Sequence, residues 1–134
     1  MTESESAGVT PDAAPDARTD RVSIPEALDR LTEFWSQRVL GRANDTLLKV
    51  AKGIGSTTWH THDDQDETFI VYSGRLTVQL RDRKVILNPG DLFVVPMGVE
   101  HCPTAEEETR FLILGRTVTS NAAGGKPEWS YSGE

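Results

Sequence analysis

Hydrophobic and polar residues alternate with a period of two over most of the chain between roughly residues 44 and 116. Such alternation is typical of strands that bury one face. Turn residues interrupt it about every eight to twelve positions, as at Ser73-Gly74 and Asn88-Pro89-Gly90. Short strands separated in this way predict an all-β sandwich or barrel.

The alternation also predicts which side chains face the interior. If Glu67 points inward, so do Phe69 and Val71, because every second residue of a strand lies on the same face. Gly53 and Gly55 are expected to end the first strand, and the run of acids at 106–108 is expected to form a solvated turn. The expected strands cover residues 47–52, 57–62, 67–73, 76–81, 85–87, 92–95, 101–105 and 110–114.

One segment before the strands has helical spacing instead. Apolar residues recur there from Ile24 to Phe34, Ser23 stands in front as an N-cap, and Pro25 falls in the first turn. We expect a short amphipathic helix over residues 25–34 that covers one end of the barrel.

The composition of the chain places one domain between two tails. Residues 1–21 are rich in Ser, Glu, Ala, Pro, Asp and Thr, and predict a disordered acidic tail. Residues 22–118 contain the patterned segments and form the expected domain, whose size within a chain of 134 residues permits a real core. The Gly- and Ser-containing stretch 119–134 predicts a flexible C-terminal tail.

The charge distribution excludes some classes of partner. The formal net charge is -7, and residues 1–20 supply -4 of it, with five acids against one base. Because the chain has no basic stripe, nucleic acid is a poor partner. No apolar run approaches the ~20 residues that span a membrane, and the N-terminus lacks the regions of a signal peptide. The single cysteine, Cys102, cannot form an intrachain disulfide, so we expect a cytoplasmic protein.

All three histidines of the chain belong to one short constellation, His60-Thr61-His62 and His101, with Glu67 between them. In a strand, His60 and His62 point to the same face, so both imidazoles can reach one cation. Glu67 adds an anionic oxygen, and His101 closes the site from a more distant strand. These four residues are the predicted metal ligands.

Three imidazoles and one carboxylate suit borderline divalent ions such as Fe, Mn, Ni, Cu or Zn, and we expect one such ion per chain. An octahedral ion keeps two positions for water, dioxygen or a bidentate substrate. One cysteine cannot build a closed thiolate site. Since no histidine remains as a general base, the chemistry rests on the metal, with Glu67 as a candidate catalytic group if it releases the ion.

Each of these residues also has a plainer interpretation. The four ligands can form an ordinary hydrogen-bonded polar cluster. Strand parity places Cys102 opposite His101, which indicates a surface or interface residue. The acids Asp63, Asp64 and Asp66 are expected in a solvated loop, with extra ligands as the alternative. On the same parity argument, Ser56 and Thr58 face inward, and Trp59 and Thr61 face outward.

The spacing of glycines and prolines around the ligands resembles the two conserved motifs of the cupin superfamily, in particular small single-domain cupins of the cupin_2 type. The first motif runs from Gly55 through the ligands to Gly74, and the second from Gly90 through Pro96-Met97-Gly98 to His101. The resemblance implies a double-stranded β-helix barrel and implies that His60, His62, Glu67 and His101 bind the metal. Ala105 stands where the family often has Asn.

Two classes of function follow from this resemblance. The first is a metal-dependent enzyme acting on a small polar organic molecule, either an oxidoreductase of the Fe(II) dioxygenase type or a non-redox isomerase, cyclase or lyase with an ion such as zinc. The second is a non-catalytic small-molecule binding or sensing cupin. We also expect a homodimer, because sheet edges and outward apolar residues such as Trp59 need a partner surface.

Overall fold

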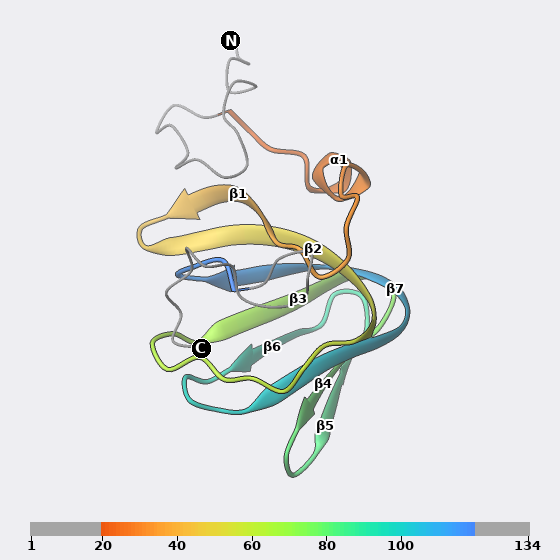
Figure 1. Cartoon of the computed structure of the whole chain (residues 1–134). Helices are drawn as coiled ribbons and strands as arrows, with labels where there is room; N and C mark the ends of the chain where they lie inside the picture. Colours follow the sequence, from red (N-terminus) through yellow and green to blue (C-terminus); the bar gives the residue numbers. More distant parts are fainter. Residues whose placement is uncertain (1–19, 120–134) are drawn as a thin grey trace.

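A computed structural model describes residues 20–119 of the chain, and the remainder of both predicted tails lies outside the described residues (Figure 1). In this part of the chain, one short helix precedes seven strands, and all strands that pair with each other are antiparallel. The prediction of an all-β barrel with a short N-terminal helix is therefore confirmed. The elements are α1 (Ile24–Asp29), β1 (Arg38–Ala43), β2 (Thr46–Ser56), β3 (Glu67–Ser73), β4 (Leu76–Leu80), β5 (Lys84–Leu87), β6 (Leu92–Val95) and β7 (His101–Gly115).

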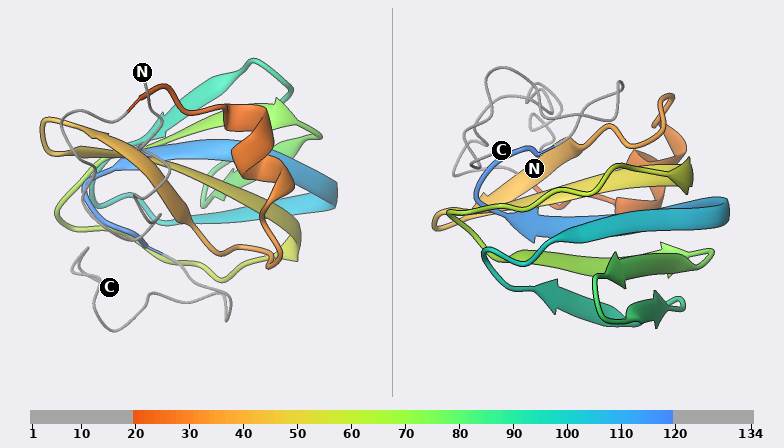
Figure 2. Two further views of the ribbon diagram at one scale, coloured as in Figure 1. Left: turned by 90° about the horizontal axis from the view of Figure 1, so that it is seen from above. Right: turned by 60° about the horizontal axis from the view of Figure 1, so that its bottom comes forward.

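The long strand β7 organises the sheet. It pairs with β2 from Leu47↔Gly115 to Ser56↔Thr104, with one bulge. On its other edge, the second half of β7 pairs with β3 and the first half with β4. The strand order β1-β2-β7-β3-β6, with β4 and β5 attached through β7, gives a curved sheet that wraps round an interior (Figure 2).

The barrel interior is filled by side chains that the alternation predicts to face inward. Phe69 and Val71 of β3 are buried, and Phe111 of β7 pairs with Val71 across the sheet. The Phe111 ring lies 6.0 Å from the Phe69 ring and 5.9 Å from the Trp35 ring, measured between centroids. The buried cluster is Ala51, Phe69, Val71, Leu76, Val78, Leu87, Val95, Phe111 and Ile113.

The strand β2 does not end at Gly53 and Gly55, as the sequence indicated, but continues to Ser56. Gly53 is required for packing: a Cβ atom there would lie 2.5 Å from the Trp35 ring. The backbone N–H of Trp35 donates to Lys52 O, and its indole N–H donates to Ile54 O at 3.0 Å. Trp35 therefore covers β2 at the position where the missing side chain leaves room.

The helix begins at Ile24, one residue before the predicted start, and ends at Asp29, five residues before the predicted end at residue 34. The Ser23 hydroxyl accepts from the Glu26 N–H, which confirms the N-cap. Leu28 and Leu31 are buried against Val50 of β2. Beyond Asp29 the chain leaves the helical course, and Trp35, with a φ of 60°, donates its backbone N–H to Lys52 O of β2.

Three further predictions about the strands are wrong. Residues 57–62 form no strand, and only His60 makes an isolated bridge, to His101. Ser56 and Thr58 are consequently exposed and do not face inward. The acids at 106–108 are exposed but lie within β7, which is one strand of 15 residues and not two strands joined by a turn. The strand β1 had no counterpart among the predicted strands.

Candidate metal centre

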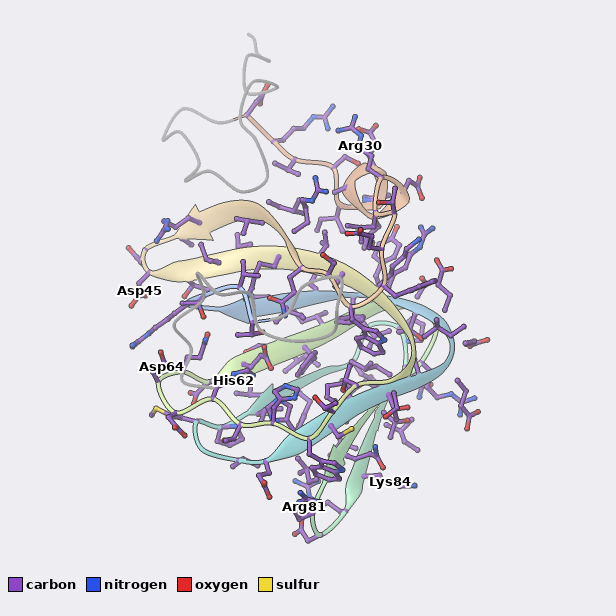
Figure 3. All side chains as sticks on the ribbon, in the orientation of Figure 1. Arg30, Asp45, His62, Asp64, Arg81 and Lys84 are labelled. Atoms are coloured by element: carbon purple, nitrogen blue, oxygen red, sulfur yellow. The ribbon has the colours of Figure 1, made fainter. Side chains whose placement is uncertain are left out.

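The four predicted ligands come together at one end of the barrel. His62 lies in the loop between β2 and β3 (Figure 3). Glu67 is the first residue of β3, and His101 is the first residue of β7. One donor atom from each, with His60 included, lies within 4.8 Å of every other. His62, Glu67 and His101 are buried, and His60 is partly exposed.

Backbone contacts hold the loop with the first two histidines against β7. The N–H of His60 donates to His101 O at 3.0 Å, and the N–H of His101 donates back to His60 O at 2.9 Å. The N–H of Gly98 donates to His62 O, at a turn where glycine adopts a φ of +84°. These backbone contacts, and not the predicted strand, bring His60 and His62 to the same point.

Two of the imidazoles have a defined tautomer. The Nδ1 atoms of His60 and His101 lie 2.7 Å and 2.9 Å from the backbone carbonyls of Thr58 and Val99. Because a carbonyl oxygen only accepts, each Nδ1 must carry the hydrogen. In the neutral ring the Nε2 lone pair is then free to bind a metal, as in many metal sites where the second ring nitrogen is anchored by a carbonyl.

The carboxylate of Glu67 lies between the imidazoles. Its Oε1 atom is 3.1 Å from Nε2 of His62 and 3.2 Å from Nε2 of His101. A neutral His101 has no hydrogen on Nε2, so two acceptors face each other unless a proton or a cation joins them. Two ligand atoms that are each about 2.1 Å from one ion and at right angles are about 3.0 Å apart. The donor set and its spacing therefore fit one divalent ion.

The local electrostatics favour the metal-binding form of two of these groups, Glu67 and His60. Burial alone raises the pKa of Glu67, but the hydrogen bonds and charges of His101 and His62 outweigh it and hold that pKa well below its usual value. Burial, and then the nearby His101, lower the pKa of His60. At neutral pH, Glu67 is thus a carboxylate and His60 a neutral imidazole.

These directions predict how metal binding depends on pH. Protons compete with the ion for the imidazoles, so affinity falls as pH decreases. Because the pKa of His60 lies below its usual 6.5, we expect the metal affinity to fall to half of its neutral-pH value only below pH 6.5. Metal titrations at constant ionic strength between about pH 5 and 8 test this, and an affinity that does not change over that interval would contradict histidine ligation.

A short segment after β7 covers the site, and the sequence analysis did not identify it. The Thr119 hydroxyl donates to Glu67 Oε2 at 2.9 Å, and the Gln37 amide binds both the N–H and the hydroxyl of Thr119. Gln65, also buried, donates to the Thr117 hydroxyl. We call residues 116–119 the C-terminal strap. Thr119, which the sequence analysis assigned to the tail, is buried in this contact.

The sequence analysis also did not identify a buried lysine that contacts this strap. Lys49 is 1% exposed and donates from Nζ to Thr117 O of the strap. Burial lowers the pKa of Lys49 to about 8, and the charge of Glu67 partly opposes that shift. The alternation in the sequence could have identified Lys49, because Leu47, Lys49 and Ala51 lie on one face of the strand. A polar residue on a face that is otherwise apolar indicates a functional or structural role.

The other residues that the sequence analysis considered, two loop acids and the cysteine, lie outside the ligand cluster. Asp63 and Asp66 are exposed, and Asp66 accepts from the Met97 N–H at 2.8 Å, so neither belongs to the ligand cluster. Cys102 is not a surface residue, as parity suggested, but is 2% exposed. The docked loop buries it, since its Sγ lies 3.4 Å from Thr57 O.

Comparisons with known proteins agree with this architecture. The family described as Cupin_2, the cupin domain, matches residues 46–115, more than half of the chain. A cupin-2 domain containing protein from Shewanella frigidimarina is 38% identical with a TM-score of 0.68, over 69% of this chain and 91% of that one. KdgF from a Halomonas species is 27% identical with a TM-score of 0.54, over 63% of this chain and 78% of that one.

A curated relative matches over a shorter region. The uncharacterized protein YdbB of Bacillus subtilis is 33% identical over 63 residues, which are 46% of this chain and 56% of that protein. The match therefore spans little more than half the length of this relative.

Proposed function

The chain belongs to the Cupin_2 domain family, and from that premise we propose that it is a mononuclear metal-dependent enzyme that acts on a small polar organic molecule. One observation carries the proposal. The ring nitrogens of His60 and His101 are oriented by backbone carbonyls so that their Nε2 lone pairs face the cluster that contains Glu67. An ordinary polar cluster does not need two imidazoles in contact with one carboxylate oxygen and a third imidazole beside them.

The residues around the ligands favour reaction over structural metal binding. Phe69 approaches His101 with 6.4 Å between ring centroids, and the walls behind it are apolar, so water is limited near the ligands. A divalent ion held there supplies Lewis acidity or activates dioxygen. His60, the partly exposed ligand, marks the side from which a small molecule reaches the centre. We assign Glu67 to metal binding in this proposal, because both of its oxygens have partners and its pKa is low.

Two assays separate the branches of the proposal. Protein is loaded with Fe(II) under nitrogen and then mixed with solutions that contain dissolved oxygen and candidate substrates. Oxygen consumption is recorded. Protein loaded with Zn, Mn or Ni is screened for isomerisation, cyclisation and elimination. Turnover that disappears on chelation and returns with metal supports the enzyme, whereas turnover that survives complete metal removal contradicts it.

A non-catalytic binding or sensing module is the second candidate, favoured by the burial of the site. Three of the four ligands are buried, and Thr119 of the C-terminal strap donates to Oε2 of Glu67, the oxygen that does not contact the histidines. A closed site of this kind suits ligand capture. Tight binding of a small molecule to the metal-loaded protein, with no turnover under any of these metals, favours this function.

We also propose that the protein is a homodimer formed through the outer face of β3 and β6. Ile70 pairs with Leu92 across these strands, and β6 ends the strand order. The outward side chains of Tyr72, Leu92 and Val94 are 44%, 60% and 41% exposed. An unpaired edge beside an apolar face is a common site of two-fold association.

We therefore expect wild-type protein to sediment as a dimer at micromolar concentration, and Leu92→Asp to sediment as a monomer. The matched control is Ile54→Asp, which changes an exposed residue of β2 elsewhere on the barrel. Sedimentation velocity measures all three proteins. Wild-type protein that sediments as a monomer would contradict the proposed dimer. If both variants dissociate equally, the interface does not lie on the outer face of β3 and β6.

A further inference from the structure

The interior face of β2 carries a charged residue that metal binding does not use, Lys49. Lys49 pairs with Ile113 of β7, and Ile113 pairs with Phe69 of β3. Residues directly opposite each other in antiparallel strands project from the same face. Ile113 and Phe69 both belong to the buried core, so the side chain of Lys49 also points into the barrel.

The Lys49 ammonium has more donors than the surrounding protein uses. It carries three N–H groups, and among the described residues Thr117 O is the acceptor that takes one of them. Glu67 is the charge that acts on it, but the oxygens of Glu67 already contact His62, His101 and Thr119. A buried ammonium with unused donors is costly unless a further acceptor binds it.

The charge of the metal-loaded site makes that acceptor an anion. Three neutral imidazoles, one carboxylate and a divalent ion sum to a formal +1, and Lys49 adds a second positive charge inside the barrel. Coulombic interactions are strong in an interior that excludes water. An anionic ligand would therefore be stabilised both by the ion and by the ammonium.

We propose that Lys49 is a specificity-determining residue that binds the carboxylate of the substrate, and that the substrate is a small organic acid with a second oxygen donor, as in a 2-hydroxy or 2-oxo acid. This inference rests on the proposed metal site. The C-terminal strap links the two groups, because Thr117 contacts Lys49 and Thr119 contacts Glu67. A structural lysine that only secured the strap would show no preference for the charge of a ligand.

A pair of matched probes distinguishes these roles. Glycolate and glycolamide both offer a hydroxyl and a carbonyl-type oxygen, but only glycolate is anionic. Protein loaded with Co(II) is titrated with each probe, and binding is followed by the visible spectrum of the ion. The variant is Lys49→Met, which keeps a long side chain and removes the charge, and the control is Lys52→Met, on the same strand.

We expect Lys49→Met to bind Co(II) at least as well as wild type, because a nearby positive charge is removed. Its affinity for glycolate should fall roughly 10- to 100-fold, the range for a lost charge-assisted hydrogen bond, while its affinity for glycolamide stays unchanged. Lys52→Met should match wild type with both probes.

The failures of the two proposals are separable. A wild-type protein that binds no Co(II) overturns the metal site itself. If Co(II) binds but glycolate leaves its spectrum unchanged at every concentration, or if Lys49→Met weakens both probes equally or neither, the role of Lys49 is overturned and the metal site stands.

Discussion

Replacing His101 with alanine is expected to lower the affinity of the protein for divalent metal by more than about 100-fold. Loss of a group that merely orients a ligand costs roughly 10- to 100-fold, and we propose that His101 is itself a ligand. Its Nδ1–H is anchored on Val99 O, and its Nε2 faces Glu67 Oε1 at 3.2 Å. Isothermal titration of metal-free protein with Zn(II) or Co(II) measures the loss.

The matched control is Asp63→Ala. Asp63 lies in the same loop as His62, is exposed, and stands outside the ligand cluster. Its replacement should leave the affinity within a factor of about two, since exposed substitutions away from a site have small effects. Full metal occupancy in His101→Ala would show that the ligand assignment is wrong.

The second large effect concerns stability. Phe111→Ala is expected to reduce the free energy of unfolding by about 3–5 kcal/mol, because it removes a buried aromatic ring and leaves a cavity. The Phe111 ring packs between those of Trp35 and Phe69, and Phe69 in turn contacts His101. Urea denaturation of the metal-free protein gives the change without a contribution from bound ion.

Ile86→Ala serves as the control for this measurement, because Ile86 is 53% exposed on β5. Its loss should change the free energy of unfolding by less than about 1 kcal/mol. Similar losses in the two variants would contradict the placement of Phe111 at the centre of the core.

The alternation of apolar residues predicted the part of the fold that depends on local sequence. Phe69, Val71, Leu76 and Val78 are buried as expected, because parity within a regular strand decides which face a side chain occupies. The glycine and proline positions predicted the family, which the match to residues 46–115 confirms. The grouping of His60, His62, Glu67 and His101 was predicted from spacing, and the structure brings their donor atoms together.

The predictions that failed depended on contacts between distant segments. Residues 57–62 have the composition of a strand, but hydrogen bonds to Pro103 and His101 hold them as an irregular loop. That loop also buries Cys102, which no local pattern reveals. Thr119 contacts Glu67 across 52 residues of sequence, so its place in the site could not be predicted from spacing.

The central claim is that four side chains of each chain hold one divalent ion, and counting the ion tests this most directly. Protein purified without an affinity tag is made metal-free, reloaded with excess Co(II), desalted and measured by plasma mass spectrometry. We expect one ion per wild-type chain and none in His101→Ala. A wild-type chain that retains no ion, or a variant that retains as much as wild type, would contradict the claim.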